Sequence, residues 1–164
     1  MRKILIILLF LGTLIAGAID LKAPIDDYRI TSTTGYRKNP MGGNDMELHK
    51  GVDLVGPHHC EIRAAADGIV VDCWPAPNGY YKGHPALGGL VIIDHGDGML
   101  TLYGHLSVLY VRRREKVKAG DVIGRQGRTG ICTGEHLHWE VIVNPLLFIR
   151  EPMSILEMRR RNAN

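Results

Sequence analysis

Histidine and aspartate residues occur in this chain at spacings that suit a metal or catalytic centre. His136 and His138 are two residues apart in the segment GEHLHWEV, and His49 and Asp53 are four apart in HKGVDL. His105 follows Tyr-Gly in TLYGHLS. Because residues two or four apart lie on one side of a strand, each segment can direct its polar side chains to one face.

The segment around the two nearby histidines shows this division most clearly. His136, His138 and Glu140 share one face by alternation. The other face is apolar and carries Leu137, Trp139 and Val141. A strand of this kind has its apolar face against a core and presents both imidazoles on the opposite side.

The other two segments follow the same logic. Gly51, between His49 and Asp53, argues against a helix and leaves the face of a strand open above it. His105 is predicted to share a face with Thr101 and Tyr103. Leu102, Gly104 and Leu106 are predicted to point the other way.

Convergence of these groups would form a catalytic zinc site. Two imidazoles and a carboxylate are suitable protein ligands, with a fourth position open for water. Zinc lowers the pKa of that water and polarises a carbonyl oxygen, and the remaining histidines then move protons or stabilise an oxyanion.

Four other histidines receive a different interpretation: His58, His59 and His84 as loop and surface residues, and His95 as a structural residue at a strand end.

The remainder of the chain predicts an all-β fold. Its 164 residues suit one domain, and its 20 glycines separate short apolar runs. We expect one antiparallel sheet or hybrid barrel with loops that form a groove, and few or no long helices. Residues 61–74 and 88–111 are each predicted to form two strands around a turn. Residues 115–127 alternate around Ala119-Gly120, and 135–143 are predicted to form one strand. Residues 19–53 are polar and are predicted to be loop-like, and only 151–161 show helical periodicity.

The first 18 residues are predicted to be an export signal. Arg2 and Lys3 precede an apolar stretch from Ile4 to Ile15, and Ala16-Gly17-Ala18 forms a small-x-small cleavage site. Retention of this segment as a membrane anchor is the alternative. Either outcome places the rest of the protein outside the cytoplasm, in the periplasm, cell envelope or medium.

Cysteine content and charge add little to the functional interpretation. Cys60 and Cys73 are equidistant from a predicted turn, so a disulfide and two buried thiols are both compatible with the sequence. Cys132 remains without a partner.

The net charge of +3 is mild, and the basic runs 112–114 and 159–161 are interpreted as solvated surface, without a nucleic-acid partner. A weak preference for anionic envelope polymers fits equally well.

The motifs together resemble the lysostaphin-type (LytM-type) zinc metallopeptidases, which cut peptide cross-links of bacterial cell walls. The resemblance covers about residues 33–143. It rests on GYRKNP, HKGVDLVGP, IRAAADGIVV, the segment from GGLVIIDHGDG to TLYGHLS, and KVKAGDVIGRQGRTGICTGEHLHWEV.

This resemblance implies roles for the five residues. His49, Asp53 and His138 are implied to bind one zinc ion per chain, and His105 and His136 to be catalytic without holding the metal. The implied reaction is amide hydrolysis by water at zinc, with one histidine assisting proton transfer and the other stabilising the oxyanion. Which histidine does which stays open.

The implied domains are a metallopeptidase domain over 19–150 and a basic tail over 151–164. Family members usually have proline at the position of Glu135 and phenylalanine at that of Trp139. Glu135 is expected to influence the pKa of His136, and Trp139 to fill the core. Residues 75–86 are expected to line the substrate groove, with Tyr80 and Tyr81 either packing or contacting substrate.

Two other classes of protein compete with the enzyme. One is a catalytically inactive envelope protein of the same fold that binds or regulates other wall hydrolases. The other is a carrier module, since KVKAGDVIG resembles part of lipoyl- and biotinyl-type barrels, but no lysine stands in a recognisable carrier setting. For the enzyme we expect peptidoglycan peptide stems as partner, membrane contact only through an uncleaved N-terminal segment, and a monomer.

Overall fold

The computed structural model describes residues 19–76 and 84–143, and these residues form strands and loops without a helix. None of the described residues forms a helix long and apolar enough to cross a membrane. The strands are β1 (Arg29–Ser32), β2 (Gly35–Lys38), β3 (Met46–His49), β4 (Val52–Val55), β5 (Glu61–Arg63), β6 (Gly68–Trp74), β7 (Gly89–Asp94), β8 (Met99–Leu106), β9 (Val108–Leu109), β10 (Lys116–Val117), β11 (Val122–Arg125) and β12 (Leu137–Val143). The predicted all-β class is confirmed.

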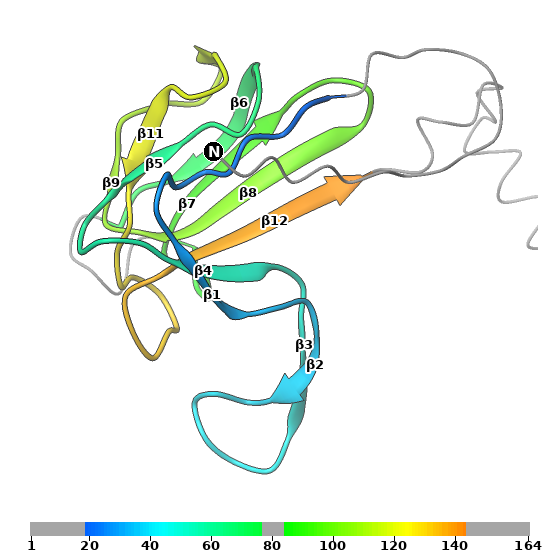
Figure 1. The fold of residues 1–164 in the computed structure, drawn as a ribbon, viewed down its shortest axis with the longest axis vertical. Helices are drawn as coiled ribbons and strands as arrows, with labels where there is room; N and C mark the ends of the chain where they lie inside the picture. The colour runs from blue at the N-terminus through cyan, green and yellow to red at the C-terminus, as the bar shows by residue number, and fades with distance from the viewer. Residues whose placement is uncertain (1–18, 77–83, 144–164) are drawn as a thin grey trace, which may run out of the picture.

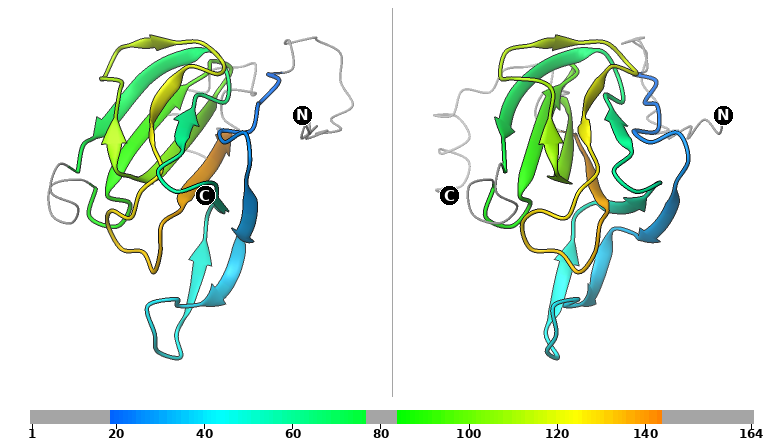
Figure 2. Two further views of the ribbon diagram at one scale, coloured as in Figure 1. Left: turned by 60° about the vertical axis from the view of Figure 1, so that its left-hand side comes forward. Right: turned by 90° about the vertical axis from the view of Figure 1, so that its left-hand side faces the viewer.

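The strands divide among three antiparallel sheets. The largest has seven strands in the order β1-β4-β12-β8-β7-β6-β10. A three-stranded sheet has the order β5-β11-β9, and β2 pairs with β3 in a separate hairpin. That hairpin extends away from the two larger sheets (Figures 1 and 2).

The core draws its side chains from both larger sheets. Ile62 and Ile123 from the three-stranded sheet join Val91, Tyr103 and Leu137 from the seven-stranded sheet in one buried cluster. The apolar faces of β8 and β12 are therefore directed toward the three-stranded sheet. Their opposite faces remain available for polar residues.

Not every predicted turn joins paired strands. Residues 88–111 do contain the expected hairpin, because β7 pairs with β8 around the HGDG turn. Residues 61–74 and 115–127 each contain two strands, but in neither segment do the two strands pair with each other. β5 pairs with β11, whereas β6 and β10 pair with each other in the large sheet. Each of those two segments crosses from one sheet to the other, and the buried alanines Ala64, Ala65 and Ala66 lie at one crossing.

This arrangement removes the basis for the proposed disulfide. Cys60 precedes β5 in the small sheet, and Cys73 lies on β6 in the large one. They are not opposite each other, and both are free thiols, as is Cys132. Of the two alternatives left by the sequence, unpaired thiols agree with the structure.

The segment before Gly51 is more ordered than predicted. It holds β1, β2 and β3 where a loop was expected. Its polarity reflects exposure, because the β2–β3 hairpin packs little of its surface. Even its apolar members Tyr36 and Leu48 are 75% and 51% exposed.

Several sequence predictions lie outside the described residues. These are the signal or anchor at 1–18, the tail at 151–164, the helical pattern there, and Tyr80 and Tyr81. The same holds for residues 144–150 at the end of the predicted domain.

Leu137 tests the assignment of faces on β12. Its side chain is fully buried in the core, whereas Ile142 on the same strand is 37% exposed. We expect Leu137→Ala to lower the free energy of unfolding by about 2–5 kcal/mol, because it removes buried methyl groups and leaves a cavity. Urea denaturation measures the change, and Ile142→Ala is the matched control with a much smaller loss. Equal losses in both variants would contradict the assignment.

Candidate active site

Three side chains from β3, β4 and β12 converge on one point. His49 Nε2, Asp53 Oδ1 and His138 Nδ1 lie 3.0 Å from one another in all three pairs. All three residues are buried. Ligand atoms around a tetrahedral zinc ion are about 3.3 Å apart when each bond is about 2.0–2.1 Å. The triad therefore has the composition and spacing of a site for such an ion.

The β-sheet register produces this convergence. β12 pairs with β4 so that His138 lies opposite Asp53. On β8 the partner of His138 is Gly104, and a Cβ there would be 3.5 Å from His138 Cβ. Asp53 and His138 thus share a face that is opposite the buried Leu54 and Leu137. The predicted division of faces on β12 is confirmed.

His49 reaches the site by a different route from the one predicted. A single strand does not carry both His49 and Asp53. His49 ends β3, and the chain turns at Lys50 and Gly51 before β4 begins. Gly51 does leave the space that the sequence suggested. A Cβ on Gly51 would be 2.8 Å from His138 Cε1 and Nε2.

A β-bulge directs His105 toward this same face. Gly89 pairs with Leu106 and Val91 with Tyr103, so Leu90 alone lies opposite Gly104 and His105. His105 has a φ of 62°, in the left-handed region that residues other than glycine seldom adopt. The prediction that His105 shares a face with Thr101 and Tyr103 is wrong. Those two side chains point into the core, and the bulge turns His105 away from them.

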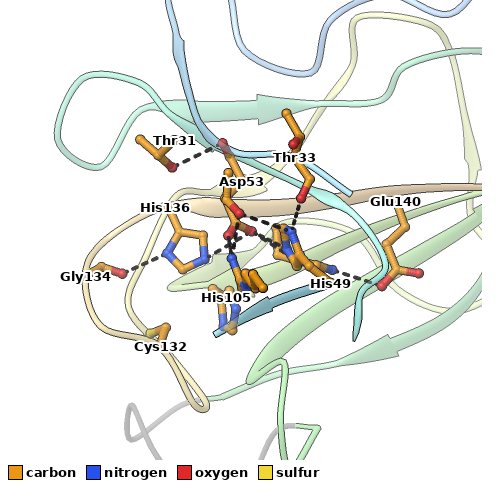
Figure 3. A network of polar contacts seen from close by, with 12 residues as sticks. Thr31, Thr33, His49, Asp53, His105, Cys132, Gly134, His136 and Glu140 are labelled. Carbon is orange, nitrogen blue, oxygen red and sulfur yellow. Dashed lines mark hydrogen bonds and ion pairs between the residues drawn. The ribbon is translucent and has the colours of Figure 1, made fainter. Parts of the chain in front are cut away.

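Hydrogen bonds fix which ring nitrogen of each triad histidine faces the centre. His49 Nδ1 donates to the Thr33 carbonyl oxygen at 2.8 Å, which leaves Nε2 directed at Asp53. His138 Nε2 donates to Glu140 Oε1 at 2.9 Å, which leaves Nδ1 directed inward. Figure 3 shows the contact between His49 and Thr33. Metal-binding histidines usually donate their second N–H to such an acceptor.

Arg37 holds the carboxylate of the triad from behind. Its Nη1 donates to Asp53 Oδ2 at 3.0 Å and to Ser32 Oγ at 2.7 Å. Burial by itself would raise the pKa of Asp53, but the hydrogen bonds from His138 and Arg37 outweigh it and hold that pKa well below its usual range. Asp53 is therefore ionised at neutral pH and presents Oδ1 to the centre.

The proton of His138 depends on the same carboxylates. Burial alone would lower the pKa of His138. Hydrogen bonds to Asp53 and Glu140 oppose this effect and raise the pKa to about 9. In the metal-free protein at neutral pH, both ring nitrogens of His138 thus carry protons, one shared with each carboxylate.

Two further imidazoles border the triad. The rings of His105 and His136 are 4.6 Å apart, and those of His105 and His138 are 6.0 Å apart. His105 Nδ1 donates to the Thr129 carbonyl oxygen at 2.7 Å, and His136 Nδ1 to that of Gly134 at 2.9 Å. Burial, followed by the proximity of His136, lowers the pKa of His105 to about 4. His105 is therefore neutral near pH 7, with its Nε2 free to accept a proton.

The structure thus brings together all five residues singled out in the sequence. His136 completes the group, with Nε2 3.5 Å from Asp53 Oδ1. Sequence reasoning missed Arg37 and the backbone acceptors at Thr33 and Thr129. The alternation on β12 already placed Glu140 on the same face as His138, which was a usable signal for its contact.

The remaining histidines lie elsewhere. His95 is hydrogen-bonded through Nδ1 to the Asp67 carbonyl oxygen at 2.7 Å and through Nε2 to Thr101 Oγ1 at 2.6 Å. Such contacts are expected for a structural residue. His84 is half-buried and accepts a hydrogen bond from the Leu87 N–H, so it is not a simple surface residue. His58 and His59 are exposed as predicted.

The two unusual residues beside the HxH motif have different environments. Trp139 packs against the core, as predicted. The polar contacts of Glu135 are to His58, His59 and Gln126. Its carboxylate therefore interacts with the loop of residues 57–60.

Comparison with known proteins agrees with this geometry. Residues 47–146 match the profile of Peptidase family M23. This range contains the triad, His105 and His136, and the chain belongs to that peptidase family. The predicted resemblance to lysostaphin-type peptidases is confirmed.

Related sequences include a peptidase and an activator of hydrolases. The chain is 38% identical over 122 residues to the DD-carboxypeptidase/endopeptidase Mpg of Neisseria meningitidis. The matched region covers 74% of this chain and 26% of Mpg. It is 34% identical over 142 residues to the murein hydrolase activator NlpD of Salmonella typhimurium, covering 82% of this chain and 34% of NlpD. The chain thus spans about a quarter to a third of the length of these relatives.

Solved structures share the fold. A zinc-containing peptidase from Vibrio cholerae superposes with a TM-score of 0.63 at 33% identity, over 73% of this chain and 35% of that one. The catalytic domain of lysostaphin from Staphylococcus simulans gives 0.58 at 29% identity, over 71% of this chain and 81% of that one.

The space above Gly51 can be tested directly. A methyl group at this position would be 2.6 Å from the Trp139 carbonyl oxygen as well as 2.8 Å from the His138 ring. We expect Gly51→Ala to displace the His138 imidazole and break its hydrogen bond to Glu140. Nitrogen-15 NMR of the histidine rings would show the changed state of His138. Gly134→Ala is the control, because nothing lies within 4 Å of a Cβ there. An unchanged His138 signal in Gly51→Ala would refute this description of the site.

Proposed function

We propose that this protein is a zinc-dependent endopeptidase that hydrolyses peptide cross-links of bacterial peptidoglycan in the cell envelope. The observation that carries the proposal is the triad of His49, Asp53 and His138, with inward-facing ligand atoms and two more imidazoles beside it. The similarity to the peptidoglycan DD-endopeptidase ShyA of Vibrio cholerae, at 36% identity over 121 residues, supports the substrate class.

The three triad residues would hold the metal. Each offers one inward atom, and Thr33, Glu140 and Arg37 fix the orientation of these groups from outside. Zinc bound there would supply Lewis-acid chemistry, lowering the pKa of a water molecule and polarising the scissile carbonyl.

His105 is suited to accept the proton of the attacking water. Its Nδ1 is fixed by Thr129, and its lowered pKa of about 4 keeps Nε2 unprotonated at neutral pH. As the bond between water oxygen and carbonyl carbon forms, a water proton moves to Nε2. The same proton then passes to the amine nitrogen as the C–N bond breaks.

His136 is suited to stabilise the negative oxygen that develops. Its Nδ1 is held by Gly134, and Nε2 lies on the same side as Asp53 Oδ1. In its protonated form, Nε2–H donates a hydrogen bond to the oxygen of the tetrahedral intermediate. Donors positioned in this way before the reaction contribute strongly to catalysis.

A non-catalytic role is the second candidate. It is favoured by the similarity to NlpD, a murein hydrolase activator, over 82% of this chain. A protein that only binds and regulates other hydrolases has no need of five polar groups fixed around a centre. For this reason we favour the enzyme.

Digestion of defined peptidoglycan with the purified, zinc-loaded protein tests the proposal. Mass analysis of the fragments should show cleaved cross-links and identify the bond. His138→Ala should bind one zinc ion fewer than the wild type and lose hydrolysis. His105→Ala should keep its zinc and lose about 100-fold or more in rate, because it lacks the proton acceptor.

Three outcomes would contradict this account. They are undiminished zinc in His138→Ala, full activity in His105→Ala, and intact cross-links with the zinc-loaded wild type. If the intact protein instead stimulates another wall hydrolase added to the digest, the activator role replaces the enzyme.

Zinc affinity should also depend on pH. Because the pKa of His138 is raised to about 9, the metal must displace a proton from Nδ1 at any lower pH. The association constant should thus rise about tenfold per pH unit from about pH 7 to 8.5 and level off above 9. Competition titration with a chelator measures this slope.

Glu140→Gln is the matched variant for the pH test. It removes one of the two carboxylates that raise the pKa of His138. The proton is then lost at lower pH, so the rise in affinity should level off earlier than in the wild type. A pH-independent affinity in the wild type would contradict the assignment of His138 as a ligand.

A further inference from the structure

A second group of metal-ligand type lies outside the triad. His58 and His59 are adjacent in the loop before β5, and their rings are 4.0 Å apart. Glu135 approaches them from the loop before β12. One potential ligand atom from each of the three residues lies within 4.8 Å of the others. Among the described residues this is the one such group besides the triad.

The carboxylate of this group is held in place by the protein. Glu135 Oε1 accepts hydrogen bonds from the His59 N–H at 2.6 Å and from Gln126 Nε2 at 3.1 Å. Gln126 is 1% exposed, and its own Oε1 accepts from the Gly56 N–H at 2.9 Å. A buried side chain therefore orients Glu135, as outer residues orient the carboxylate ligands of metal sites. Oε2 remains directed at His58.

The backbone of His59 is also unusual. It has a φ of 53°, in the left-handed region that residues other than glycine seldom adopt. In this conformation the backbone N–H of His59 donates a hydrogen bond to Glu135, and the His59 ring lies beside the ring of His58. Side-chain exposures of 78% for His58 and 51% for His59 give an ion access from solvent.

The charges within the group suit a divalent ion. Burial by itself raises the pKa of Glu135, but hydrogen bonds from His59 and Gln126 and the contact with His58 lower it, so the carboxylate is ionised. Burial and the nearby Glu135 carboxylate raise the pKa of the Cys60 thiol. The potential ligands of the group are thus two imidazoles and one carboxylate.

We propose that His58, His59 and Glu135 form a second, surface site for a divalent transition-metal ion. Two imidazole nitrogens and a carboxylate oxygen suit zinc, copper or nickel rather than calcium or magnesium. An ion at this site would join the 57–60 loop to the loop that carries His136, since Glu135 and His136 are consecutive. This site is additional to the single ion of the triad and does not rest on the proposed peptidase activity.

Zinc binding to matched variants tests the site. With zinc chloride as the probe, calorimetry and metal analysis of the wild-type chain should give two ions per chain. His58→Ala and His59→Asn should each weaken the second ion by about tenfold or more, because each loses one of three ligands. Asparagine tolerates the left-handed backbone of His59 and so preserves the loop. Asp45→Asn removes an exposed carboxylate elsewhere and should still bind two ions.

The two sites can be distinguished in the same measurements. His138→Ala should keep the surface ion and lose the buried one, and His58→Ala should do the reverse. One ion in the wild type together with none in His138→Ala would overturn the surface site alone. Two ions bound with unchanged affinity in both His58→Ala and His59→Asn would also overturn it. Circular dichroism of each variant confirms that the loss of an ion is not a loss of folding.

Discussion

In the register that pairs β4 with β12, Asp53 lies opposite His138, and Leu54 lies next to it opposite Leu137. Neighbouring residues on a strand point to opposite faces, so the same pairing buries the two leucines and brings the two polar side chains together. A slip by one residue would place the polar pair in the core. The cost of burying an unpaired carboxylate and imidazole thus ties the geometry of the site to the packing of the sheet.

The other parts of the site adjust to this fixed pair. The turn at Lys50 and Gly51 brings His49 back over β4, and the absence of a side chain at Gly51 leaves room for the His138 ring. The bulge in β8 turns His105 out of the core. Each imidazole is then oriented by an acceptor outside the centre, as Figure 3 shows for His49 and His136. The site is therefore held by backbone geometry and hydrogen bonds that do not themselves require a metal.

Local sequence patterns predicted the parts of the molecule that local rules determine. The alternation in 135–143 identified β12 and both of its faces, and the HGDG turn identified the hairpin of β7 and β8. The predicted partners of β5 and β6 were wrong because pairing between sheets depends on contacts distant in sequence. The same limit explains the disulfide, which required Cys60 and Cys73 to be in one hairpin.

The site could be predicted as a set of residues more readily than as a geometry. Regular alternation placed His105 on the wrong face, because a bulge with a left-handed residue leaves little mark in the sequence. The contact between Arg37 and Asp53 joins a hairpin to the large sheet, and no spacing in the chain encodes it. Glu135 directly precedes His136 in the sequence, yet its carboxylate contacts the loop that carries His58.

The central claim is that three particular atoms hold the catalytic metal while two histidines remain free of it. Diffraction from crystals of the zinc-loaded protein, measured at the zinc absorption edge, tests this most directly. The account predicts a zinc peak in the buried site, bonded to His49 Nε2, Asp53 Oδ1 and His138 Nδ1, with His105 and His136 beyond bonding distance. A zinc ion bonded to His105 or His136 in place of a triad residue would contradict it, as would a buried site without zinc.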